Sequence, residues 1–201
     1  MKKIGLFLII ILLVTLHTGL SNAQTFTAFL NAGSSTIQAG LDIEHTLDQG
    51  YMRTGLSGFH FNHDHGKIKM LEGHVAIGND ILMEGLTGEL GIKGLIGTAD
   101  KRNREGDLGS LGFMIGGIYQ LPINVFPVST KIFAEMSWTP GPLAFIDMDG
   151  YFDMKAGVDV FIVEHAAMEF SYQRYNMDMT EGPGDWTRKE NIFTIGVKLK
   201  F

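Results

Sequence analysis

The chain has 201 residues, no cysteine and a formal net charge of −6. The absence of cysteine excludes a disulfide framework and a thiolate metal site. The acidic balance also argues against a nucleic-acid partner, because the phosphate backbone is itself negative.

The N-terminal segment has the layout of a secretory signal peptide. Two lysines precede an unbroken apolar run over residues 4–16, and small residues lead up to Ala23, after which we expect cleavage. The run is shorter than the roughly 20 residues of a spanning helix, so a retained anchor helix is the weaker alternative. We therefore predict a signal peptide over 1–23 and an exported domain over 24–201, with 14 basic and 22 acidic residues.

The exported part alternates strand-like segments with turn signals. Apolar and polar residues follow a two-residue period in most segments, which indicates strands with two different faces. No later apolar run could form a spanning helix, and a closed β-barrel is the only other structure that satisfies every backbone group in lipid. In chain order, the expected strands cover residues 26–32, 36–45, 51–62, 67–78, 82–98, 109–121, 128–139, 151–162, 166–176 and 191–201.

The connections between these segments predict the strand number and the orientation. The longer ones, at 99–108, 140–150 and 177–190, fall on one side and the shorter ones on the other, as in barrels with long outer loops. The expected fold is an all-β, antiparallel, up-and-down transmembrane barrel of ten strands. Eight strands are the alternative, if the first two segments fuse and the hairpin around 51–78 does not span.

The last strand carries an apolar face that ends on the C-terminal residue. This face resembles the closing strand of a bacterial outer-membrane barrel, the signal for insertion by the barrel-assembly machinery; an edge strand of a soluble sandwich is the alternative. The predicted insertion signal consists of Phe193, Ile195, Val197, Leu199 and Phe201.

The opposite parity of the strands predicts a charged lumen. Charges of both signs there suggest a cross-lumen network that fills the barrel, because unpaired charges would be costly to desolvate. A narrow path for water or small solutes is the alternative. The predicted network consists of Asp42, Glu44, Glu72, Glu89, Lys93, Lys131, Glu135, Asp153, Lys155, Asp159, Glu169 and Lys198. Aromatic girdle residues are expected at Trp138, Tyr172 and Phe201.

Other candidate sites carry less weight. His63, Asp64 and His65 form a weak candidate for a divalent metal, although their spacing is not a known ligand signature. The basic residues of 100–104 could contact lipopolysaccharide phosphates. No nucleophile motif such as GxSxG is present, so we expect neither an enzyme nor a bound cofactor. A rim hydrolase or acyltransferase using the histidines, and a receptor or adhesin working through the outer loops, are the alternatives.

Two stretches carry a family resemblance. Residues 149–176 read DGYFDMKAGVDVFIVEHAAMEFSYQRYN, residues 26–40 read FTAFLNAGSSTIQAG, and the chain ends in GVKLKF. Together they resemble the YfaZ family of small outer-membrane proteins. The resemblance implies a porin-like β-barrel in a Gram-negative outer membrane and brings no catalytic motif. We therefore expect a structural or narrow-channel barrel in contact with outer-membrane lipid and lipopolysaccharide.

Overall fold

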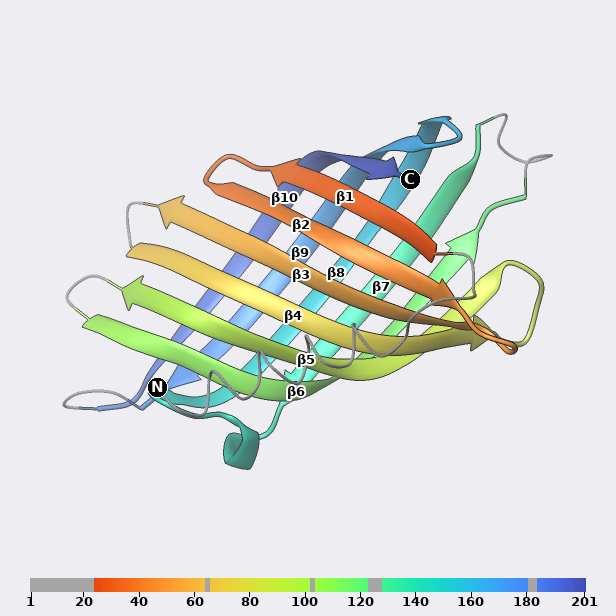
Figure 1. Ribbon diagram of the computed structural model, residues 1–201. Coiled ribbons are helices and arrows are strands. Elements are labelled where there is room, and N and C mark those ends of the chain that lie inside the picture. Colours follow the sequence, from red (N-terminus) through yellow and green to blue (C-terminus); the bar gives the residue numbers. More distant parts are fainter. Residues whose placement is uncertain (1–23, 64–65, 102–103, 123–127, 181–183) are drawn as a thin grey trace.

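The computed structural model describes residues 24–63, 66–101, 104–122, 128–180 and 184–201. Within these residues, ten antiparallel strands close into one barrel (Figure 1). In chain order they are β1 (Gln24–Ala32), β2 (Thr36–Thr46), β3 (Tyr51–His63), β4 (Gly66–Asp80), β5 (Leu86–Lys101), β6 (Arg104–Gln120), β7 (Thr130–Thr139), β8 (Met148–Val163), β9 (Ala166–Met179) and β10 (Trp186–Lys200). The predicted ten-strand barrel is confirmed, and the eight-strand alternative is wrong.

The barrel closes where the last strand meets the first. Each strand pairs with its sequence neighbours, and β10 pairs with β1 from Ala32↔Ile195 to Thr27↔Lys200. The backbone of Phe201 extends this seam, because its N–H donates to the carbonyl of Phe26 at 2.8 Å and its carbonyl accepts from the N–H of Phe26 at 3.1 Å. Every strand thus pairs with two neighbours, as a sheet in lipid requires, while the far parts of β10 and β6 extend beyond their pairing with β1 and β7.

The two faces of the wall differ as a membrane barrel requires. Large apolar side chains are exposed on the outside of almost every strand, and exposed Leu, Ile and Phe in such number mark a surface that faces an apolar medium. The predicted insertion signal lies on this outer face, with Phe193 and Phe201 both 73% exposed. Other members of the outer face are Leu30, Ile37, Leu41, Leu56, Ile77, Leu90, Ile92, Phe113, Ile115, Trp138 and Ile195.

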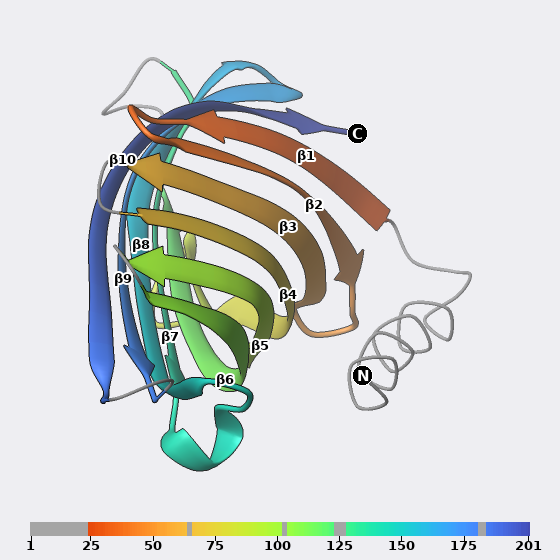
Figure 2. The same cartoon turned by 90° about the vertical axis from the view of Figure 1, so that its left-hand side faces the viewer.

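Figures 1 and 2 show two walls whose strands cross in projection. β1–β6 form one wall and β7–β10 the other, and the sheet curves round at both sides to join them. We call the end that carries Gln24 and Phe201 the near end, and the opposite end the far end.

The long loops expected at the far end are largely wrong. The β5–β6 hairpin stays paired up to Lys101↔Arg104, and the β9–β10 hairpin up to Trp186↔Met179. Alternation continues through both hairpins, and their exposed polar residues, such as Asp178, give the sequence the appearance of a loop. The segment 140–150 contains a short 3₁₀ helix, Gly141–Leu143, before β8 begins.

Connection length therefore does not mark the outer side of the barrel. The nine residues 121–129 join β6 to β7 at the near end and exceed every connection at the far end. What distinguishes the far end is that its hairpins carry exposed polar residues on their outward face, including Glu105, Asp107, Asp178 and Lys189. The barrel thus projects beyond its apolar belt at the far end.

The described residues include no helix that is long and apolar enough to cross a membrane. The predicted signal peptide, residues 1–23, lies outside the described residues.

Candidate functional site in the barrel lumen

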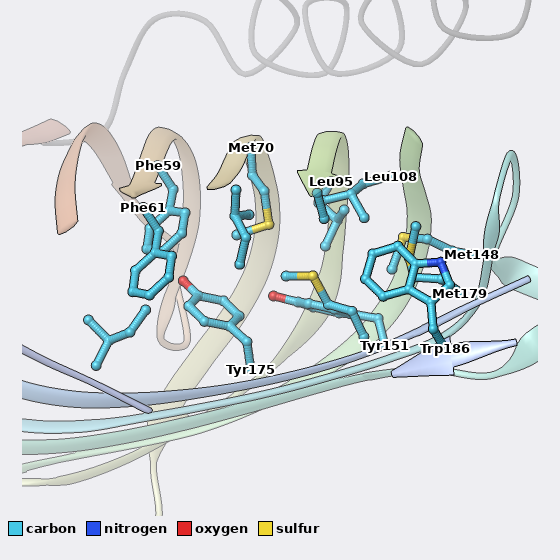
Figure 3. Close-up of a cluster of buried hydrophobic side chains, with 14 residues drawn as sticks. Phe59, Phe61, Met70, Leu95, Leu108, Met148, Tyr151, Tyr175, Met179 and Trp186 are labelled. Carbon is cyan, nitrogen blue, oxygen red and sulfur yellow. The ribbon is translucent and has the colours of Figure 1, made fainter. Parts of the chain in front are cut away.

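The far half of the lumen is filled by apolar and aromatic side chains. They come from the inward positions of both walls and form one buried cluster, which we call the apolar plug (Figure 3). The plug consists of Phe59, Phe61, Ile68, Met70, Leu95, Ala99, Leu108, Met148, Tyr151, Tyr175, Met177, Met179, Trp186 and Ile192.

Ring contacts across the lumen hold the two halves of the plug together. Phe59 of β3 meets Tyr175 of β9 with ring centroids 5.1 Å apart, and Tyr175 lies 6.3 Å from Tyr151 of β8. Figure 3 shows Phe59, Met70 and Leu95 reaching from one wall toward Tyr175 and Tyr151 on the other. Aromatic pairs at such distances contribute beyond their buried area, so the plug joins strands that are far apart in the sheet.

The plug is closed to solvent. Ile68, Leu108, Tyr175 and Met177 have no exposed surface. The hydroxyl of Tyr151 donates to Glu72 Oε1 at 3.2 Å. This hydrogen bond marks the boundary between the apolar plug and the charged part of the lumen.

Lys93 of β5 is the centre of the first charged layer. Its Nζ lies 2.6 Å from Asp153 Oδ2, 3.6 Å from Glu72 and 3.7 Å from Glu135. Gln173 adds a hydrogen bond to the other oxygen of Asp153 at 2.9 Å. The side chains come from β4, β5, β7, β8 and β9, so the layer crosses the whole lumen.

Arg53 of β3 forms the second layer, closer to the near end. Its Nη2 lies 2.6 Å from Glu89 and 3.3 Å from Glu135, while Nη1 lies 3.9 Å from Asp42. His74 Nε2 lies 3.6 Å from the same aspartate. Glu135 contacts both Arg53 and Lys93 and so joins the two layers into one network.

A separate charged cluster follows the seam of the barrel. Glu169 accepts from Lys155 at 2.8 Å and lies 2.9 Å from Lys198 Nζ, which also contacts Asp159 at 2.7 Å. The amide of Asn31 on β1 donates to Glu169 at 3.0 Å. Since β1 and β9 both flank β10, these bonds bridge the strands on either side of the closing strand.

Below the plug the lumen contains a cavity of about 210 Å³. The cavity reaches the near rim, where Thr25, His165 and Lys200 line it. We call this space the vestibule. It is blind, because the apolar plug occupies the lumen above it.

The structure brings the sequence-predicted lumen residues together. All of them except Asp153 line the vestibule, and Asp153 lies deeper, against Lys93. Within the described chain, Glu44 and Lys131 form no ion pair; Lys131 lies over the ring of Phe161 instead, 5.4 Å from its centroid.

Sequence reasoning missed the plug and two polar partners, Tyr51 and Arg53. The signal for the plug was the weak alternation of β3, where Phe59 and Phe61 fall on the inward parity. Arg53 and Tyr51 of β3 share that parity. The hydroxyl of Tyr51 donates a hydrogen bond to Glu89 of β5 at 2.7 Å.

Two further predictions fall at the edges of the described residues. Asp64 and His65 of the metal candidate lie outside them, and His63 stacks on Phe61 with ring centroids 6.2 Å apart. The described residues contain no group of three or more His, Cys, Asp or Glu that could hold a metal ion. In the basic segment 100–104, Lys101 and Arg104 donate to backbone carbonyls of Thr187 and Gly184 in the neighbouring hairpin.

The girdle candidates lie at different heights. Trp138 is exposed near the far end of β7, and Phe201 is exposed at the near end. Tyr172 lies in the middle of β9, where its hydroxyl donates to Asn191 at 2.7 Å and its ring contacts Phe193 at 4.9 Å.

An apolar outer face, a closed sheet and a side-chain-filled lumen define an antiparallel transmembrane β-barrel. The chain belongs to the YfaZ family: the family model described as "YfaZ precursor" matches residues 1–201. Among curated proteins, no sequence matches the chain significantly.

Several solved β-barrels are similar to the chain at low identity. The N-terminal β-barrel domain of Pseudomonas aeruginosa OprF is 14% identical, covers 90% of this chain and 98% of its own, and gives a TM-score of 0.37. The translocator domain of the autotransporter NalP from Neisseria meningitidis is 10% identical, with 100% and 95% coverage and a TM-score of 0.44. The NanC porin is 11% identical, with 89% and 100% coverage and a TM-score of 0.38.

Proposed function

We propose that the protein is a non-conducting integral barrel of the outer membrane, with a structural role and a blind vestibule that opens to the periplasm. The observation that carries this proposal is the apolar plug across the far half of the lumen. We place the far end outside, because its hairpins project beyond the apolar belt and carry exposed polar residues on their outward face.

The outer membrane is the location that fits the outer face. Its apolar belt needs lipid, and an exported chain reaches that membrane when residues 1–23 act as a signal peptide cleaved after Ala23. The barrel-assembly machinery is the expected partner for insertion, through the apolar face of β10.

A closed lumen is better supported than a narrow channel. A water path would have to pass Phe59, Leu95 and Tyr175, each at most 3% exposed. Beneath them Lys93 is held by three carboxylates, so opening the path would also break ion pairs that are buried. Such pairs are costly to disrupt one partner at a time.

We also propose that the barrel is not an enzyme. The lumen carboxylates serve mainly as partners of Arg53, Lys93, Lys155 and Lys198. His74 faces Asp42, and among the described residues no serine or threonine hydroxyl bonds to it. A nucleophile activated by a base needs that contact.

Conductance in planar lipid bilayers tests the proposal. Refolded protein that migrates as a heat-modifiable barrel should give no current steps above the lipid baseline. A variant carrying Phe59→Ala, Leu95→Ala and Tyr175→Ala should pass more current than the unmodified barrel, because it removes three of the plug side chains above Lys93.

The matched control is Leu56→Ala, which shortens an outward side chain of β3 and should stay silent. Discrete steps from the unmodified barrel would contradict a closed lumen. The conductance of the unmodified barrel tests the proposal even if the triple variant does not fold.

A further inference from the structure

A groove of about 530 Å³ lies on the outer face over β2–β5. Small residues, Ala39, Gly58 and Gly97, line it between the larger side chains of Ile37 and Leu71. A side chain built on Gly58 would meet no atom within 4 Å, so the space above this residue is open. An extended apolar chain could lie in this groove against the barrel wall.

Basic side chains stand at the far end of the groove. His60 and Lys69 line it and lie directly opposite each other on β3 and β4, both exposed. Lys67 is exposed two residues further toward the far end, beside Asn62. Outward positions of β4 thus change from lysine to Leu71 and Ile77, so the cations mark the far boundary of the apolar belt.

In the described part of the chain, the two lysines lie near the acidic side chains of β5 and β6 without pairing with them. Neither Lys67 nor Lys69 forms an ion pair there, although Asp100 lies on the outward parity of the neighbouring strand β5. The lumen lysines differ, because Lys93, Lys155 and Lys198 each contact at least one carboxylate. The outward lysines are therefore available to an anion that approaches from the membrane.

A second groove on the outer face provides a comparison. It lies over β1 and β8–β10 and also exposes apolar side chains, but no charged residue lines it. Its lining consists of Ala32, Gly33, Ala156, Phe170, Ser171, Tyr172, Phe193, Thr194 and Ile195. Of these two grooves, only the one over β2–β5 combines an apolar hollow with basic side chains at the membrane boundary.

We infer that the groove over β2–β5 binds one lipopolysaccharide molecule of the outer leaflet. One acyl chain lies over Ala39, Gly58 and Gly97, and a lipid A phosphate lies between His60 and Lys69, with Lys67 beside it. Basic side chains at the membrane boundary recognise lipid phosphates through charge-assisted hydrogen bonds. The inference rests on the proposed outer-membrane location, because only that membrane has a leaflet of phosphorylated, acylated glycolipid.

Native mass spectrometry of the refolded barrel in detergent tests the inference. Titration with bisphosphorylated lipid A should give a one-to-one complex, and its completely dephosphorylated form should bind at least tenfold more weakly. The double variant Lys67→Gln with Lys69→Gln should lose at least tenfold in affinity. Gly58→Leu should also weaken binding, because its Cβ meets no atom within 4 Å and its side chain would take up space in the groove.

The matched control is Lys189→Gln, an exposed outward lysine on β10 that lies away from the groove. It should bind lipid A as the unmodified barrel does. Unchanged binding by the double variant, an equal loss in the control, or equal binding of phosphatidylglycerol would each overturn the assignment.

Two other measurements separate this inference from the proposed function. Fractionation that finds the protein outside the outer membrane would refute the proposed location whatever the lipid result. An outer-membrane, non-conducting barrel whose lipid A binding ignores Lys67 and Lys69 would refute the inference alone.

Discussion

At the scale of single residues, Lys93 shows how a charged lumen is stabilised. Its side chain is 7% exposed, and its ammonium lies within 4 Å of Asp153, Glu72 and Glu135. Burying a charge is unfavourable unless partners replace water. Around Lys93, the three carboxylates take the place of water. Tyr151 and Gln173 in turn donate hydrogen bonds to Glu72 and Asp153.

Lys93→Met should therefore destabilise the barrel strongly. Removing one partner of a buried ion pair costs about 3 to 5 kcal/mol, because it leaves the other charge uncompensated. Urea unfolding in detergent micelles measures the change in the free energy of unfolding. Lys189→Met, at an exposed site, is the control and should change that free energy by less than about 0.5 kcal/mol.

A loss for Lys93→Met no larger than for the control would show that Lys93 does not hold the network. Adding Asp153→Asn to Lys93→Met should recover part of the stability, since it removes one of the uncompensated charges.

At the scale of the strand, alternation predicted most of the fold. β8 and β10 have clear two-residue periods, and their inward and outward faces are those expected. The faces of the far halves of β3 and β4 could not be predicted in this way. Phe59, Phe61 and Met70 are apolar on the inward parity, so the alternation of apolar and polar residues is interrupted there. Only the opposite wall, with Tyr175 and Tyr151, gives these side chains a partner, and no local pattern contains that information.

The lumen network was predictable for a related reason. A charge on the inward parity of a barrel strand has only the lumen to occupy, so Lys93 and Glu135 could be placed without knowing their partners. The pairing itself could not be predicted, since Lys93 lies 60 residues from Asp153. Arg53 was missed because the alternation of β3 is weak around it.

The prediction at the scale of the strand concerns β10, which closes the barrel. Phe201→Ala should reduce the fraction of heat-modifiable barrel in the outer membrane several-fold, because the terminal aromatic ends the insertion signal beside the seam with Phe26. Phe113→Ala is a matched control, since Phe113 is another exposed phenylalanine of the outer face, at 56%, and lies outside the insertion signal. Equal insertion defects in the two variants would mean that general apolarity, and not the C-terminal position, drives assembly.

At the scale of the whole molecule, the barrel has two zones. The far half is packed like a protein core, and the near half is a charged vestibule of about 210 Å³. A small barrel has an interior just wide enough for side chains to fill, and this chain fills half of it with apolar groups. The plug is the basis of the proposed closed lumen, and the outward groove is the basis of the proposed lipid recognition.

Methyl NMR of the methionines tests the central claim, a dry plug inside an apolar outer face, most directly. Met70, Met177 and Met179 lie in the plug, whereas Met136 and Met154 face outward and are 42% and 36% exposed. In detergent micelles, a lipid-phase paramagnetic agent should broaden Met136 and Met154, and the three plug methyl groups should resist both that agent and a water-soluble one. Broadening of Met70 and Met177 by the water-soluble agent would contradict the account, because it would show a lumen open to water.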